Sequence, residues 1–245
     1  MRILLINPNT SVSVTALVAD HVRRHLRDAG DEPVELVPVT ARFGAAYIAS
    51  RAALAIAGHA ALDALAEHVE GCDAAYLACF GDPGLAALRE ISPVPVTGMV
   101  EASVEAAAQR ASRFAIVTGG AAWRPMLEEI VAGLGHAPGL VAVRTVAPTG
   151  GEIARDPESA LAGLVAACRA CAEEDGAGAV ILGGAALAGL AERIQPDVPV
   201  PVLCSVAAGA NAVLSAARAP QRTPSFDPTA STGLGAPLAD RLAGA

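Results

Sequence analysis

The second half of the chain repeats the pattern of the first half. Short apolar runs alternate with Ala-rich stretches, and the run RILLI at residues 2–6 reappears as RFAIV at 113–117. PVTGMVEA at 95–102 likewise corresponds to PVLCSVAA at 201–208, at nearly the same separation along the chain. Apolar runs that alternate with helical stretches are typical of βαβ units on a parallel sheet. The repeat therefore predicts an α/β fold of two similar parallel-sheet lobes, related by a pseudo-two-fold duplication, with a cleft between them.

The expected elements divide the chain into three regions. The first lobe covers residues 1–99 and is completed by the helix near 206–217, the second covers 100–205, and the Pro/Gly/Ser-rich segment 220–245 is a flexible tail with at most a short final helical turn. We expect strands near 2–6, 33–39, 73–78, 94–98, 114–118, 140–146, 179–183 and 200–204. We expect helices near 11–29, 47–70, 84–90, 101–110, 122–134, 157–174, 186–194 and 206–217.

Composition limits the classes of function. Hydrophobic residues make up 53% of the 245 residues, enough for a substantial core, and the net charge of −8 argues against binding to nucleic acid. No apolar run is long enough to cross a bilayer and no signal-peptide pattern opens the chain, so we expect a cytoplasmic protein with no membrane partner. The five cysteines have no framework spacing and indicate reduced thiols. All 17 basic residues are arginines, which excludes a lysine Schiff base.

Cys79 is the candidate with the most definite chemistry. It ends the apolar run at 74–78 and opens the turn Phe80-Gly81-Asp82-Pro83-Gly84 before a helix. A thiol at a helix N-terminus has a lowered pKa, so the sequence predicts a reactive sulfur. Gly184 holds the corresponding place after the strand near 179–183. Because the carboxyl ends of parallel strands line the cleft of such folds, we expect Cys79 and Gly184 to face each other there.

Two segments carry a resemblance to a known family. Ile6-Asn7-Pro8-Asn9-Thr10 and Ala78-Cys79-Phe80-Gly81-Asp82-Pro83-Gly84 resemble the loops of the Asp/Glu/hydantoin racemase superfamily, most closely the hydantoin and allantoin racemases, over roughly residues 1–217. The resemblance implies a cofactor-independent isomerase in which two cysteines move a proton at a carbon next to a carbonyl. It also implies a small substrate with a carboxylate or imide group and a homo-oligomer. Cys79 would be the catalytic acid/base.

The second lobe departs from the family pattern. The expected Gly-Cys-Ala-Gly-Met reads Gly183-Gly184-Ala185-Ala186-Leu187, and because several neighbours differ as well, the glycine is taken as natural. Cys204 at a neighbouring strand end is a candidate substitute acid, although a buried strand residue is its plainer interpretation. A single cysteine facing a glycine also resembles arylmalonate decarboxylase with the lobes reversed, which favours a one-base decarboxylase, tautomerase or lyase. A catalytically inactive metabolite-binding homologue is the second alternative.

Loops after the first strand of each lobe are candidate anion-binding sites. Asn7, Asn9, Thr118 and Gly119 supply hydroxyl and amide groups that suit a carboxylate or a developing enolate, although capping of helices explains the asparagines too. The substrate-binding candidates are Asn7, Pro8, Asn9, Phe43, Phe80, Gly81, Thr118, Gly119, Gly184 and Ala185.

Two other spacings imitate metal and redox motifs. His21 and His25 have the i,i+4 spacing of zinc ligands, but no third ligand is evident and a solvated helix face explains them better. We therefore predict no metal site. Cys168 and Cys171 lie one turn apart inside an expected helix, which favours two core thiols over a redox pair. The glycines at 183, 184 and 189 do not form a dinucleotide-binding loop.

Overall fold

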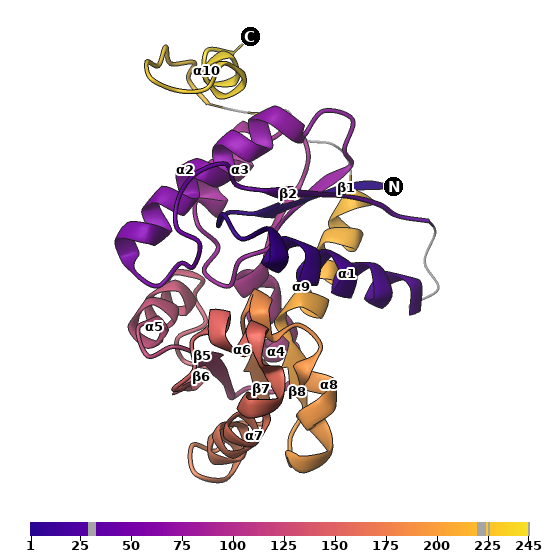
Figure 1. Ribbon diagram of the computed structural model, residues 1–245, viewed down its shortest axis with the longest axis vertical. Coiled ribbons are helices and arrows are strands. Elements are labelled where there is room, and N and C mark those ends of the chain that lie inside the picture. The colour runs from indigo at the N-terminus through magenta and orange to yellow at the C-terminus, as the bar shows by residue number, and fades with distance from the viewer. Residues whose placement is uncertain (29–32, 220–223, 225, 245) are drawn as a thin grey trace.

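Two four-stranded parallel sheets form the framework of the protein. The computed structural model describes all residues except 29–32, 220–223, 225 and 245. The first sheet has the order β2-β1-β3-β4 and the second the order β6-β5-β7-β8, so both sheets have the same topology. The strands are β1 Arg2–Asn7, β2 Glu35–Thr40, β3 Ala74–Leu77, β4 Val96–Gly98, β5 Phe114–Gly119, β6 Leu140–Val146, β7 Ala179–Leu182 and β8 Val202–Cys204. The duplicated α/β fold predicted from the repeat is confirmed (Figure 1).

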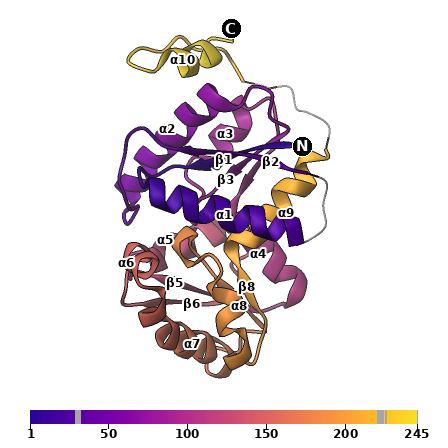
Figure 2. The same ribbon diagram turned by 45° about the vertical axis from the view of Figure 1, so that its right-hand side comes forward.

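Helices cover both faces of each sheet, and Figure 2 shows α1 running between the two lobes. Because both faces are covered, the central strands β3 and β7 are buried along their whole length and are apolar throughout. The helices are α1 Val12–Asp28, α2 Arg51–His68, α3 Leu85–Ile91, α4 Met99–Arg110, α5 Trp123–Gly133, α6 Gly150–Arg155, α7 Pro157–Glu173, α8 Leu190–Ile194, α9 Ser205–Ala217 and α10 Ala236–Leu242, with short 3-10 turns η1 Ala185–Leu187 and η2 Gln195–Asp197.

The helices that follow the last strand of each sheet cross to the opposite lobe. α4 follows β4 but packs against β7 and β8, whereas α9 follows β8 and packs against β3, β4 and α1. In α9 the missing side chain of Gly209 makes room for Tyr76 of β3, whose hydroxyl would lie 2.3 Å from an added Cβ. The crossing ties the two lobes together beside the cleft.

Two expected helices differ from those observed. The helix expected near 47–70 begins only at Arg51, because the Ser50 hydroxyl caps it by accepting a hydrogen bond from the Ala53 N–H at 3.1 Å. The helix expected near 186–194 is divided into η1 and α8 by Gly189, whose φ of +81° lies in the left-handed region. The short helix α6 was not predicted, although Thr149 and Glu152 form a capping box at its start.

The segment after residue 220 contains a packed helix. α10 lies on α2, at the end of the molecule far from the second sheet, and Leu238 is buried there (Figure 1). Arg241 forms an ion pair with Glu70 at 2.6 Å. The mobility predicted for residues 220–245 stays a prediction, and the described part of this segment includes the helix α10 packed on α2. Among the described residues, no helix combines the length and apolarity needed to span a bilayer.

Candidate active site

A cavity of about 500 Å³ opens at the carboxyl ends of the central strands of both sheets. Four predicted site residues line its wall: Thr118 at the end of β5, and Asn9, Cys79 and Gly184 in the loops that follow β1, β3 and β7. The predicted residues Phe80, Gly119 and Ala185 also line the cavity. The two lobes therefore meet at the position where parallel α/β sheets bind ligands, and Cys79 and Gly184 line one site, as the repeat predicts.

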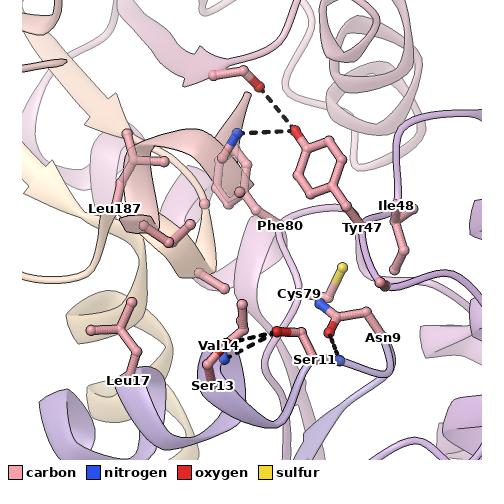
Figure 3. Close-up of a pocket in the computed structure, with 18 of the residues that line it drawn as sticks. Asn9, Ser11, Ser13, Val14, Leu17, Tyr47, Ile48, Cys79, Phe80 and Leu187 are labelled. Carbon is pink, nitrogen blue, oxygen red and sulfur yellow. Dashed lines mark hydrogen bonds between the residues drawn. The ribbon is translucent and has the colours of Figure 1, made fainter. Parts of the chain in front are cut away.

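Burial dominates the electrostatics of Cys79. Its side chain is 7% exposed and lies between Asn9 and Tyr47 in Figure 3. The N–H groups of Gly81 and Asp82 both donate to the Cys79 carbonyl oxygen, at 2.9 and 3.2 Å, and α3 begins only at Leu85. The turn thus separates the sulfur from the helix N-terminus. Burial, and to a smaller extent the Asp82 charge, raises the pKa of Cys79 above the ordinary range of a thiol, so the predicted lowering is wrong.

Asp82 fixes the shape of this turn. Its carboxylate accepts hydrogen bonds from the N–H groups of Val100 at 3.0 Å and Glu101 at 2.8 Å, which caps the first turn of α4. Its φ of +43° is the only positive value at a non-glycine residue in the described chain. Burial raises the pKa of Asp82 to about 7, against the lowering effect of backbone hydrogen bonds from Glu101, Val100 and Met99. The Cys79 loop is therefore held by the helix that crosses to the second lobe.

The loop opposite Cys79 has a backbone that only glycine adopts readily. Gly184 has φ +136° and ψ 137°, and its N–H donates to the Ser205 hydroxyl at 3.1 Å. An added Cβ would lie 2.8 Å from Leu187 Cδ1 and 3.7 Å from Thr118 Oγ1. The Gly184 loop thus has a conformation that a residue with a side chain would adopt only under strain.

Close packing across the cleft sets the distance between the two loops. The ring of Phe80, from the first lobe, lies against Gly183 in the second, and an added Cβ at Gly183 would be 2.1 Å from the ring. Any side chain there would push Phe80 away, together with the adjacent Cys79. Gly183 is therefore required for the approach of the lobes.

Asn9 presents a hydrogen-bond donor to the cavity. Its Oδ1 accepts from Asn7 Nδ2 and from the Ser11 N–H, both at 2.9 Å, so its Nδ2 must point the other way (Figure 3). Asn7 is buried, and its Nδ2 donates hydrogen bonds to Asn9 Oδ1, the Ser11 carbonyl oxygen and Thr15 Oγ1. The two asparagines thus have different roles. Asn7 stabilises the loop, and Asn9 presents an N–H group on the side of the loop that faces Cys79.

Tyr47 joins the two lobes above the cavity. Its hydroxyl donates to the Gly119 carbonyl oxygen at 3.3 Å and accepts from Trp123 Nε1 at 3.2 Å and from the Gly150 N–H at 3.3 Å (Figure 3). Arg155, at the end of α6, is the only charged residue among the described residues that line the cavity. A cation at the rim of an otherwise neutral and largely apolar pocket suits a small anionic or imide ligand.

Several predicted residues lie outside the cavity wall. Pro8 is buried behind the first loop, and Gly81 packs under Trp123, whose ring would lie 2.8 Å from an added Cβ. Phe43 packs edge-on against His59 with ring centroids 4.9 Å apart. Cys204 lies 3.6 Å from His21 Nε2 and is not among the lining residues. Asn7 reaches the site only through Asn9.

Sequence reasoning missed part of the wall. Tyr47 lies before α2 and not in the helix expected to begin at residue 47, and Arg155 belongs to α6, which was not predicted. Ile48, Trp123 and Leu187 form apolar wall. The capping-box pattern at Thr149 was the one signal that could have placed α6, and hence Arg155, near the loops.

Comparisons with known proteins agree with this arrangement. The family model described as Asp/Glu/Hydantoin racemase matches residues 3–213. The hydantoin racemase of Pseudomonas sp. (strain NS671) is 33% identical over 210 residues, 85% of this chain and 83% of that protein. The allantoin racemases of Klebsiella pneumoniae and Pseudomonas fluorescens superpose with TM-scores of 0.80 and 0.82, at 32% and 29% identity; each alignment covers 88% of this chain, and 86% and 90% of those chains respectively. The chain therefore belongs to the Asp/Glu/hydantoin racemase family.

Proposed function

We propose that this protein is a cofactor-independent isomerase that moves a proton at a carbon next to a carbonyl, with Cys79 as the acid/base. The observation that carries the proposal is the placement of the Cys79 thiol in the cavity between the lobes, beside the Asn9 amide donor. The names of the relatives favour a hydantoin-like ring or a related imide or carboxylate as substrate.

Inversion at such a carbon needs a proton acceptor on one face of the carbon and a proton donor on the other face. Cys79 serves one face. Cys204 is set aside as the second acid because it lies outside the cavity wall, against His21. We place solvent on the second face, beside the Thr118 hydroxyl and the Gly184 loop. When Cys79 is the base, the Cα–H bond breaks, the proton goes to the thiolate and the electron pair moves to the carbonyl oxygen; water then protonates the carbon from the other side, and the thiol neutralises the resulting hydroxide.

The developing enolate oxygen needs donors that are in place before the reaction. Asn9 Nδ2 is held in direction by the two hydrogen bonds to its Oδ1, and Thr118 is buried at the end of β5. Preorganised donors of this kind lower a barrier by about 3 kcal/mol each. Arg155 would hold an anionic substituent at the rim, and the apolar wall would accept a hydrocarbon side chain.

One observation favours a second candidate. The described cavity wall contains one thiol, and the opposite loop has a glycine-only conformation. A single thiol can protonate one face of an enediolate after a carboxylate leaves, so a one-base decarboxylase, tautomerase or lyase is the alternative. Assembly into a homo-oligomer remains a prediction of the resemblance, and a cytoplasmic location remains a prediction from the sequence pattern.

The test is solvent exchange at the reacting carbon. Enantiopure 5-substituted hydantoins, allantoin, aspartate, glutamate and an arylmalonate are incubated with the protein in deuterium oxide and followed by NMR and chiral chromatography. We expect deuterium at Cα with inversion for a hydantoin or for allantoin, and neither with Cys79→Ala. Exchange with retention and no inverted product, or loss of carboxylate, would favour the one-base alternative. No turnover on any of these compounds would contradict the proposal and indicate a binding protein.

A further inference from the structure

We propose that His21, Glu192 and Cys204 form a binding site for a thiophilic divalent cation of the zinc type, beside the active-site cavity. Their ligand atoms all lie within 4.8 Å of one another. The three residues come from different elements: His21 from α1, Glu192 from α8, and Cys204 from the end of β8. None of the three lines the cavity in which Cys79 lies.

The geometry of the buried pair fits a tetrahedral metal. Zinc binds a cysteine sulfur at about 2.3 Å and a histidine nitrogen at about 2.0–2.1 Å, so a tetrahedral angle separates the two ligand atoms by about 3.6 Å. Cys204 Sγ and His21 Nε2 are 3.6 Å apart. The Glu192 carboxylate is exposed and can close the remaining distance by rotation, and solvent completes the coordination.

The chemistry of the pocket also suits a cation. An imidazole nitrogen and a cysteine sulfur are both zinc ligands, and the His21 and Cys204 residues that supply them are buried. A bound cation would displace the thiol proton and neutralise the buried sulfur. The Glu192 carboxylate opposes the positive charge of the nearby Arg24 guanidinium.

The sequence pointed to a different pair on this helix. His21 and His25 have zinc-like spacing, but His25 Nε2 lies 2.8 Å from Asn211 Oδ1 and is not part of the cluster. The two ligands that join His21, namely Glu192 and Cys204, come from α8 and the end of β8, far along the chain. His25 is therefore a natural control for His21.

A metal at this position would connect the two halves of the molecule. α1 belongs to the first half of the chain, and α8 and β8 belong to the second. Leu17, one turn before His21, and Leu187, shortly before Glu192, both line the cavity. The cation would therefore hold together two walls of the active site without touching the substrate.

Cobalt(II) is the probe that tests the site, because a thiolate ligand gives it a charge-transfer absorption and tetrahedral coordination intensifies its visible bands. The full-length protein is stripped with a chelator and titrated with cobalt(II), then with zinc(II). We expect one equivalent of cobalt to produce both signatures and zinc to abolish them. Loss of a second-shell partner alone costs about 10–100-fold in metal affinity, so Cys204→Ser and His21→Gln should each cost at least about 100-fold.

Matched variants separate this site from the rest of the chain. His25→Gln and Cys79→Ser should bind as the wild type does, and zinc should raise the melting temperature of the wild type but not of Cys204→Ser. Because Glu192 is exposed, Glu192→Gln should fold and bind more weakly even if a buried variant does not fold. Absence of cobalt and zinc binding by the folded wild type would overturn the proposal. Binding that survives Cys204→Ser, His21→Gln or Glu192→Gln unchanged, or that requires Cys79, would overturn it too.

Discussion

The loops after β3 and β7 hold equivalent places in two sheets of the same topology, yet they differ in chemistry and in backbone. The first presents the Cys79 thiol on a turn that Asp82 fastens to α4. The second presents Gly184 in a conformation that other residues adopt only under strain, fastened to Ser205. Duplication fixes where the two loops meet. The local backbone then decides which side chain each loop can carry, so the two faces of a bound substrate meet different groups.

Removing the Cys79 sulfur should have the largest effect. General acid–base groups contribute about 10²–10⁴-fold, so Cys79→Ala should lower kcat/KM by that factor. Substrate binding, measured by calorimetry, should change little, because the thiol is buried at the back of the pocket and makes no charge pair. Cys72→Ala, whose thiol lies in the other core of the first lobe, is the control. Equal activity of Cys79→Ala and wild type would contradict the claim that the first loop carries the acid/base group and the second loop does not.

The titration of Cys79 is the next test. Burial raises its pKa, so the thiolate is scarce at neutral pH and its share increases as the pH rises. The rate at which iodoacetamide alkylates Cys79, followed by peptide mass spectrometry, should rise about tenfold per pH unit between about pH 7 and 9. Cys79→Ala identifies background labelling. A rate that levels off near pH 7 would show a lowered pKa of Cys79 and contradict the inference that the turn separates its sulfur from the N-terminus of α3.

Restoring a thiol to the second loop should depend on the position chosen. Gly184→Cys forces a side chain into a glycine-only conformation and against Leu187, so it should destabilise the protein by about 1–3 kcal/mol. Ala185→Cys also adds a thiol to the cavity wall, one residue along, at a position with ordinary backbone. Chemical denaturation of both variants measures the difference. Equal stability of the two would mean that the Gly184 conformation imposes no constraint.

The smallest effect concerns the contact between the lobes above the cavity. Tyr47→Phe leaves Trp123 Nε1, the Gly150 N–H and the Gly119 carbonyl oxygen without their shared partner, which should cost about 1–2 kcal/mol of unfolding free energy and raise KM. Phe43→Leu, in the same loop but outside the cavity wall, should leave KM unchanged. A higher KM for Phe43→Leu than for Tyr47→Phe would contradict the placement of Tyr47 in the cavity wall and of Phe43 outside it.

The strands and the positions of the two site loops could be predicted from the sequence, but the residues that surround the Cys79 thiol could not. The repeated apolar runs determine parallel strands, and strand ends of a duplicated sheet must converge, so the meeting of Cys79 and Gly184 was predictable. The pKa of Cys79 was not, because it depends on residues brought in by packing and on a turn that holds the sulfur away from α3. The Ala-rich pattern extended the expected helix back to Tyr47, which lies in an irregular segment before α2, and the short α6 that carries Arg155 gave no periodic signal. The Cys204–His21 contact joins residues far apart in the chain, so spacing could not reveal it.

The measurement that tests the central claim most directly is the position of the isotope during turnover. An enantiopure substrate is converted in deuterium oxide, and the deuterium content of the remaining substrate and of the inverted product is measured at low conversion. One thiol facing solvent across the carbon predicts deuterium in both, because the exchanged thiol returns its deuteron to the face it came from. Deuterium in the product with fully protiated remaining substrate would show two sequestered acid/base groups, and would contradict the account.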